Sequence, residues 1–314
     1  MIKKTTLGAL LVSFAAMLWG LDGVALTPRL YNLDVSYVVF MLHALPFLAM
    51  NLILFREYKR IKTLCPSDMI YFFLIALFGG ALGTLAIVKA LFLVEFKALT
   101  VVALLQKLQP VFAMILARIL LNERFSKNFL LWAAVALGAS YFLTFEFNRP
   151  ELALGGKMLP AALYAILAAF SFGSATVFGK RVLNKVPFQT ALFFRYGLTA
   201  LIMLAIVVAN GKIAQFSQTT PMNWVFFALI GATTGSGAIL LYYYGLRYIT
   251  ANVSTMCELW FVVSTIVFDF LLNGHVLSPI QWASSGAMLI AIYMITMNQP
   301  AETEHVRDSA LCEA

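Results

Sequence analysis

The chain has 314 residues, of which 62% are hydrophobic and 11% are charged, and its formal net charge is +8. An ordinary soluble domain is roughly 45–50% apolar and about 25% charged, so this composition excludes a disordered chain, a secreted disulfide scaffold and a soluble enzyme. The composition fits a polytopic membrane protein, and since one helical span needs about 20 apolar residues, the chain is long enough for about ten spans.

Ten apolar runs, separated by short polar segments, follow one another along the chain. The first run begins after Lys3 and Lys4 and resembles a signal peptide, but it lacks a small-x-small cleavage site, so we interpret it as an uncleaved span. Lipid requires the runs to be helical, because each backbone amide must be paired within its own segment. The predicted spans cover residues 6–27, 35–55, 68–92, 98–121, 128–146, 158–179, 188–209, 222–246, 251–272 and 279–297.

The basic residues sit mostly between the apolar runs and predict the orientation. If the N-terminus is cytoplasmic, 13 Lys and Arg residues lie in the inside segments and 5 lie in the outside segments. The positive-inside rule therefore predicts a multi-pass protein of the cell (inner) membrane with both termini in the cytoplasm. A distribution of this kind is typical of a protein bound in a lipid bilayer, and we expect no nucleic-acid partner.

The chain contains an internal repeat. At an offset of 152 residues, positions 36–126 align with 188–278 without a gap, and Gly79-x-x-x-Gly83 falls on Gly231-x-x-x-Gly235. Chance similarity between Leu-rich helices is the alternative, but it would require the paired glycines, the ungapped loops and the equal span counts to coincide. Because each half has five spans, the second half enters the membrane with the opposite orientation, as in many secondary transporters.

The predicted fold is therefore all-α, with ten transmembrane helices in two inverted five-helix repeats around a central cavity. The predicted organisation is a first repeat over residues 1–146, an external connecting loop over 147–157, a second repeat over 158–298 and a cytoplasmic polar tail over 299–314.

The fourth span carries a recognisable sequence motif. Residues 104–112 read Leu-Leu-Gln-Lys-Leu-Gln-Pro-Val-Phe, and the span ends in Leu-Leu-Asn-Glu-Arg at 120–124. The segment Leu-x-Pro-Val-Phe followed by Leu-Leu-x-Glu resembles the signature of the EamA-type drug/metabolite transporter superfamily. In the second half, Val262 replaces the proline and His275 replaces the glutamate, so that copy is the weaker match.

This resemblance implies ten helices around a central cavity, with spans 3, 4, 8 and 9 among its main lining elements. It implies transport of a metabolite, and members carry amino acids, nucleotide sugars, vitamins and amines. Many bacterial members are exporters, so the resemblance favours export over import.

Glu258 is the first candidate for substrate contact or proton coupling. A charge at the bilayer centre costs about 2.5–3.5 kcal/mol on insertion scales, so this glutamate, seven residues into span 9, needs an explanation. It shares one face of that span with polar neighbours, and such a face is expected to line a wet cavity. The alternative is a structural ion pair with Lys107 or Arg195.

Four further polar residues are candidates on spans 2, 4 and 7. Gln106 is the repeat mate of Glu258 and either lines the cavity or forms an interhelical hydrogen bond, while Lys107 either neutralises Glu258 or attracts an anionic group. Arg195 and His43 are repeat mates at the same depth of spans 7 and 2. Either they contact substrate or they form helix-packing hydrogen bonds.

The remaining candidates are aromatic or lie in the outer half of span 1. Trp19 and Asp22 share a face, and Asp22 either serves the site or pairs with Arg29. Trp260 and Tyr243 offer stacking and cation–π faces. The tyrosines at 242–244 have an alternative place in the aromatic belt at the cytoplasmic interface.

These patterns predict a secondary transporter that works by alternating access on a small polar or amphipathic metabolite. Mixed charges beside aromatic faces favour an amino acid or a related compound, while a vitamin, a nucleotide-like cofactor and an organic cation stay open. Proton exchange and downhill flux are both compatible with the sequence, since no phosphate-binding loop for ATP occurs.

No enzymatic activity, metal site or cofactor is expected. We do not expect an intramembrane enzyme, because neither the HExxH nor the GxSxG motif occurs. We do not expect a receptor, because the sequence shows no sizeable soluble domain. The sequence does not choose between a monomer and a homodimer.

Overall fold

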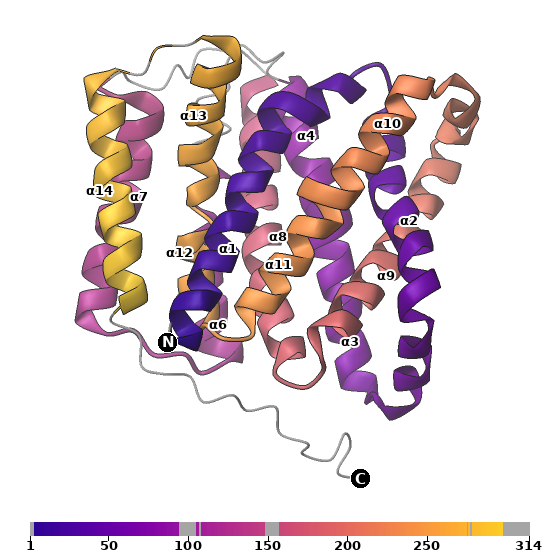
Figure 1. Cartoon of the computed structure of the whole chain (residues 1–314), viewed down its shortest axis with the longest axis horizontal. Coiled ribbons are helices and arrows are strands. Elements are labelled where there is room, and N and C mark those ends of the chain that lie inside the picture. Colours follow the sequence, from indigo (N-terminus) through magenta and orange to yellow (C-terminus); the bar gives the residue numbers. More distant parts are fainter. Residues whose placement is uncertain are drawn as a thin grey trace.

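The computed structural model describes residues 3–93, 105–106, 108–147, 157–274, 276 and 278–297. The described residues form a bundle of helices without a strand (Figure 1). The helices of the first half are α1 (Lys4–Leu21), η1 (Asp22–Leu26), η2 (Thr27–Leu30), α2 (Val35–Leu54), η3 (Phe55–Thr63), α3 (Pro66–Leu74), η4 (Ile75–Leu82), α4 (Gly83–Leu93), α6 (Gln109–Leu120) and α7 (Lys127–Phe145). Those of the second half are α8 (Met158–Leu183), α9 (Phe188–Ala209), η6 (Lys212–Gln218), α10 (Pro221–Ile230), η7 (Gly231–Gly235), α11 (Ser236–Leu246), α12 (Ala251–Cys257), α13 (Trp260–Asn273) and α14 (Pro279–Met297).

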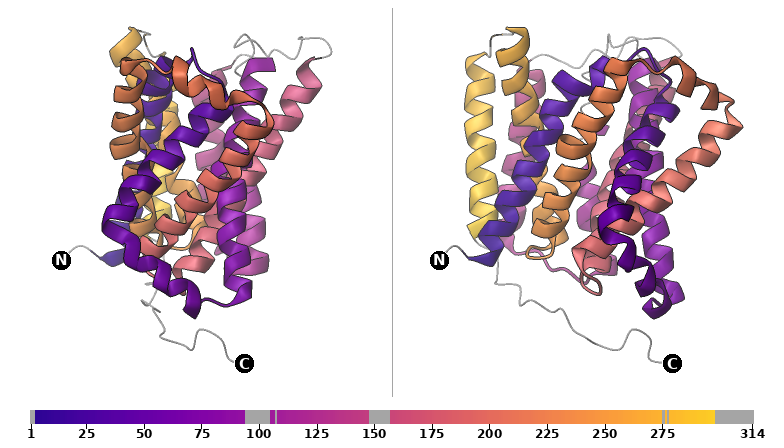
Figure 2. Two further views of the ribbon diagram at one scale, coloured as in Figure 1. Left: turned by 90° about the vertical axis from the view of Figure 1, so that its right-hand side faces the viewer. Right: turned by 45° about the vertical axis from the view of Figure 1, so that its right-hand side comes forward.

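The helices match the predicted membrane spans. Among the described residues, 8 helical stretches are long and apolar enough to cross a membrane, and the shorter apolar helices Gln109–Leu120 and Lys127–Leu143 stand where spans 4 and 5 are predicted. The helices run between the same two ends of the molecule in both views of Figure 2, and α1 begins at the end where α14 finishes (Figure 1). The all-α, ten-span prediction is therefore confirmed.

One predicted boundary is wrong, since α8 continues to Leu183 instead of ending near residue 179. Lys180 is only 2% exposed and lies inside this helix. Its Nζ donates hydrogen bonds to the carbonyl oxygens of Leu246, at 3.2 Å, and Arg247, at 3.4 Å. An ammonium group at the C-terminal end of α11 is stabilised by the helix dipole, so this lysine is buried instead of marking a loop.

The two halves repeat the same helix packing. A Cβ on Gly20 of α1 would lie 2.8 Å from Thr265 N and 3.0 Å from Phe261 O, both on α13. A Cβ on Gly173 of α8 would lie 2.7 Å from Gln109 O and 3.1 Å from Ala113 N, both on α6. Gln109 and Ala113 on α6 are the repeat mates of Phe261 and Thr265 on α13, so the same close helix crossing occurs twice, each time between a helix of one half and a helix of the other.

Irregular helical turns also recur at matched positions. The π-helical segments η4 and η7 lie in spans 3 and 8; η4 includes Gly79 and ends just before Gly83, and η7 runs from Gly231 to Gly235. Pi-helical bulges are rare and are frequent at functional sites. A third π-helical segment, η1, lies in span 1.

Span 9 is interrupted between α12 and α13. Leu259 N donates to Met256 O at 3.1 Å and Phe261 N donates to Glu258 O at 3.0 Å, so the chain passes through tight turns there. In span 4, Leu108 N donates to Leu105 O at 3.1 Å and α6 begins at Gln109, with Pro110 in its first turn. Discontinuous helices of this kind are characteristic of substrate sites in transporters with inverted repeats.

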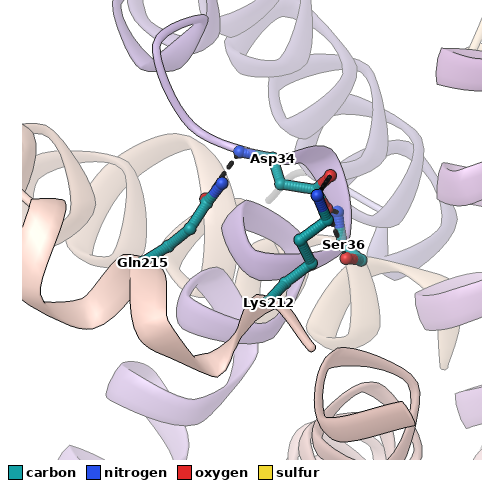
Figure 3. A network of polar contacts seen from close by, with 4 residues as sticks. All are labelled: Asp34, Ser36, Lys212 and Gln215. Carbon is teal, nitrogen blue, oxygen red and sulfur yellow. Dashed lines mark hydrogen bonds and ion pairs between the residues drawn. The ribbon is translucent and has the colours of Figure 1, made fainter. Parts of the chain in front are cut away.

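Polar contacts join the halves at both ends of the bundle. At one end, Asp34 caps α2 by accepting from Ser36 N at 2.9 Å, its own N donates to Gln215 Oε1 at 2.7 Å, and Lys212 Nζ lies 3.8 Å from its Oδ2 (Figure 3). At the other end, Glu123 accepts hydrogen bonds from Ala251 N and Asn252 N at 2.7 and 3.1 Å. The glutamate of the Leu-Leu-x-Glu motif thus caps α12, which belongs to the other half.

Candidate functional site

The site is built around Glu258, at the break between α12 and α13. Three hydroxyl groups donate to its Oε1: Tyr242 Oη at 2.9 Å, Thr176 Oγ1 at 3.2 Å and Ser254 Oγ at 3.2 Å. Gln109 Nε2 donates to its Oε2 at 2.8 Å. A carboxylate removed from water is costly unless it is hydrogen-bonded, and here four neutral donors from α11, α8, α12 and α6 supply those bonds.

The donors come from both halves of the chain. Gln109 belongs to the first half, whereas Thr176, Tyr242 and Ser254 belong to the second. The carboxylate therefore lies on the boundary between the repeats, which is where substrate and coupling sites lie in transporters of this architecture.

The break in span 4 decides which glutamine reaches Glu258. Gln106 is half-buried, and no hydrogen bond joins it to Glu258 in the described part of the chain, whereas Gln109, at the first position of α6, donates to the carboxylate. Gln106 therefore stays a predicted site residue, and Gln109, three positions later, is the glutamine that binds Glu258. Lys107, predicted as a partner of the carboxylate, lies outside the described residues.

Arg195 is not the ionic partner of Glu258. Its Nη1 donates to Tyr243 Oη at 3.1 Å and its Nη2 donates to Gly79 O at 3.2 Å, within the π-helical segment η4. Its guanidinium carbon also lies 5.6 Å from the centre of the Tyr243 ring. The predicted alternative of a Glu258–Arg195 pair is wrong, because the guanidinium fork is engaged by a tyrosine and a backbone carbonyl.

His43 bonds within its own helix, since its Nδ1 donates to Val39 O at 2.8 Å. Its ring lies 5.1 Å from that of Tyr196, measured between ring centres. These contacts agree with the alternative prediction for His43, a hydrogen bond that serves helix packing and not substrate binding.

The tyrosines of span 8 divide into two groups. Tyr242 is 3% exposed and Tyr243 is 0% exposed, and their hydroxyl groups bind Glu258 and Arg195 respectively. The aromatic-belt interpretation is wrong for these two, because α11 turns both side chains into the bundle. Tyr244 instead packs with Arg247, whose guanidinium carbon lies 5.1 Å from the centre of its ring.

Trp19 places an aromatic surface beside the carboxylate cluster. Its ring centre lies 5.5 Å from that of Tyr242, with an angle of 50° between the ring planes. Trp19 and Trp260 are both half-buried, so neither ring is enclosed by protein. Trp260 starts α13, two residues after Glu258.

Asp22 joins two π-helical segments. Its Oδ1 accepts from Thr234 Oγ1 at 2.9 Å and its Oδ2 accepts from Thr27 Oγ1 at 2.7 Å. Thr234 belongs to η7 and Asp22 to η1, so the contact ties span 1 to span 8. The alternative pairing with Arg29 is wrong, because two threonine hydroxyl groups hold the carboxylate.

Gln109 and Thr176 bind Glu258 but were not among the predicted site residues. Gln109 stands next to Pro110 and three residues after Gln106, so the proline that starts a new helix was the available signal. Thr176 follows Ser171 and Ser174 in span 6, and this polar run in an apolar span was a signal of the same kind. All three hydroxyl residues of that run are buried.

Comparison with known proteins agrees with this architecture. The profile of the EamA-like transporter family matches residues 6–145 and 159–297. The chain is 58% identical over 290 residues to the riboflavin transporter ImpX of Fusobacterium nucleatum, covering 92% of this chain and 97% of that protein. It is 21% identical over 172 residues to the uncharacterized inner membrane transporter YedA of Escherichia coli K12, covering 54% of this chain and 53% of that one.

A solved crystal structure of a protein has the same fold. It superposes with a TM-score of 0.69 over 92% of this chain and 96% of the other chain, at 15% sequence identity. Two copies of the family profile, an extensive likeness to a transporter and ten helical spans lead to one conclusion. The chain belongs to the EamA-like transporter family and is a multi-pass membrane transporter.

Proposed function

We propose that this protein transports riboflavin across the cell membrane. The observation that carries the proposal is the 58% identity, over nearly the full length of both chains, to a protein named as a riboflavin transporter. This likeness favours the vitamin alternative over the amino acid that the sequence pattern favoured.

The site chemistry supports the same choice. Riboflavin combines a flat tricyclic ring with a polar edge and a hydroxylated chain, so it needs aromatic surface beside hydrogen-bonding groups. Trp19 and Tyr242 lie beside Glu258 and Gln109 and provide both. A zwitterionic amino acid would also need a cation for its carboxylate, and Arg195, the predicted cation that the described residues include, already donates to Tyr243 and Gly79.

The test is uptake of radiolabelled riboflavin into proteoliposomes that contain the purified protein, measured as radioactivity retained in the vesicles. We expect saturable uptake that unlabelled riboflavin inhibits and that protein-free liposomes lack. Saturable uptake of amino acids without any riboflavin flux would overturn the proposal and restore the amino-acid alternative.

The same assay addresses direction and coupling. Export stays a prediction, and it is tested by loading riboflavin inside vesicles of known protein orientation and measuring efflux. Proton coupling also stays a prediction, tested by imposing a pH gradient in each direction. An unchanged initial rate would leave downhill flux as the mechanism.

A further inference from the structure

Glu258 and Gln109 place an acceptor and a donor side by side on the boundary between the two halves. Glu258 Oε2 and Gln109 Nε2 are 2.8 Å apart, and both side chains are only half-buried. The amide orientation is fixed by its neighbour, because a carboxylate oxygen can only accept and therefore faces the N–H side of the glutamine.

Both groups keep hydrogen-bonding capacity for a ligand. A carboxylate has about four lone-pair sites, and the three hydroxyl donors all bind Oε1, which leaves Oε2 with Gln109 alone. The glutamine amide has two N–H groups and uses one of them on Glu258. In the described part of the chain, the Gln109 side chain makes no second hydrogen bond.

Tyr242 links this pair to an aromatic surface. Its hydroxyl group donates to Glu258, while its ring lies 5.5 Å from that of Trp19. A flat ring that lies against Trp19 would therefore direct its edge toward the glutamate and the glutamine.

We propose that Glu258 and Gln109 recognise the imide edge of the flavin ring, with Glu258 Oε2 accepting from N3–H and Gln109 Nε2 donating to an adjacent ring carbonyl. This inference rests on the proposed function and names how the same site selects its substrate. An imide presents its N–H and its neighbouring carbonyls side by side in one plane, which matches an adjacent acceptor and donor. A hydrogen bond to a charged group is among the stronger protein hydrogen bonds, so this contact makes the imide N–H a selection point.

The first test uses the unmodified protein and a set of competing flavins. In riboflavin uptake by proteoliposomes, 3-methylriboflavin, which lacks the N3–H, should compete about tenfold or more weakly than riboflavin. Lumiflavin, which keeps the imide but lacks the ribityl chain, should compete within a few-fold of riboflavin. An analogue enlarged at C8 of the dimethylbenzene ring shows whether added bulk alone weakens competition.

The second test exchanges the donor. Gln109→Leu should raise the KM for riboflavin about tenfold and reduce the discrimination between riboflavin and 3-methylriboflavin. Gln189→Leu, the same substitution near the start of α9, is the matched control and should change neither quantity. Melting temperatures of the purified variants separate loss of recognition from loss of folding.

The possible results separate three claims: the imide assignment, the role of Gln109 and riboflavin transport itself. Equal competition by riboflavin and 3-methylriboflavin in the unmodified protein would overturn the imide assignment while leaving riboflavin transport intact. Strong discrimination that persists in Gln109→Leu would overturn the role of the glutamine. Absence of any riboflavin uptake would overturn the proposed function itself.

Discussion

At the scale of single residues, Glu258 depends on neutral donors instead of a countercharge among the described residues. Tyr242, Thr176 and Ser254 surround one carboxylate oxygen, and Gln109 binds the other. Hydroxyl groups rotate and can either donate or accept, so this surrounding can adapt when the carboxylate gains a proton or a ligand. A fixed ion pair would resist such a change.

Glu258→Gln should reduce the initial rate of riboflavin transport about tenfold or more while the protein stays folded. The substitution keeps the size of the side chain and removes its charge and its titration, so any dependence of transport on pH that arises from Glu258 should also flatten. The measurement is the uptake rate between pH 5 and 8 together with the melting temperature of the same preparation. A normal rate with an unchanged pH profile would remove Glu258 from the mechanism.

Arg195→Lys should lower stability by about 1–3 kcal/mol. Arg195 uses two separate nitrogens for Tyr243 Oη and Gly79 O. A lysine offers a single nitrogen on a shorter side chain, so we expect one buried acceptor to lose its partner. Thermal unfolding in detergent measures the change, and Arg56→Lys at an exposed position is the control. Equal melting temperatures for the two variants would mean that the fork adds nothing to stability.

At the scale of elements, the repeat reproduces the irregular features of the fold as well as its helices. The helix breaks of spans 4 and 9 and the π-helical segments of spans 3 and 8 lie at matched positions. The two helix breaks hold Gln109 and Glu258, η4 holds the carbonyl that binds Arg195, and η7 holds the threonine that binds Asp22. Local departures from regular helix thus place the polar side chains where the two halves meet.

The paired glycine contacts give a test at this scale. Gly20→Ala and Gly173→Ala should each destabilise the protein by about 1–3 kcal/mol, because an added Cβ would overlap with α13 or α6. Gly138→Ala is the matched control, since nothing lies within 4 Å of its Cβ position, and alanine there should stabilise the helix by about 0.5–1 kcal/mol.

The melting temperatures of the three variants test whether these close helix crossings are present. If Gly20→Ala were as stable as Gly138→Ala, the close crossing of α1 and α13 would not be present in the folded protein.

At the scale of the whole molecule, orientation in the membrane remains a prediction. The 13 basic residues predicted to lie inside include Lys180 and Arg181. Both lie within α8, where Arg181 Nη1 donates to Leu120 O at 3.3 Å. The excess of basic residues on the inside persists without them. The positive-inside rule therefore still predicts cytoplasmic termini.

A reporter fused after Ala314 should be active on the cytoplasmic side, and a reporter inserted near Asn148 should be active on the outside. A reporter pair that is active in opposite compartments, such as a phosphatase and a fluorescent protein, provides the measurement and its internal control. An external C-terminus would contradict the predicted topology.

The amino-acid sequence by itself determined the class of the molecule, its spans and its repeat. These follow from apolar run lengths and from self-similarity, because lipid leaves the backbone little choice but the helix. The sequence also singled out Glu258, since an acidic residue deep within a span is costly and rare.

Only the tertiary structure decided which residues meet around that carboxylate. Gln109 binds Glu258 where α6 starts at the proline turn. Tyr242 and Tyr243 face inward because α11 packs between helices of both halves. Arg195 binds Tyr243 and Gly79 because η4 brings a glycine carbonyl against α9. The helix breaks, the π-helical turns and the rotation of each helix about its axis depend on packing between segments that are far apart in the chain. The apolar pattern along one segment carries no information about that packing.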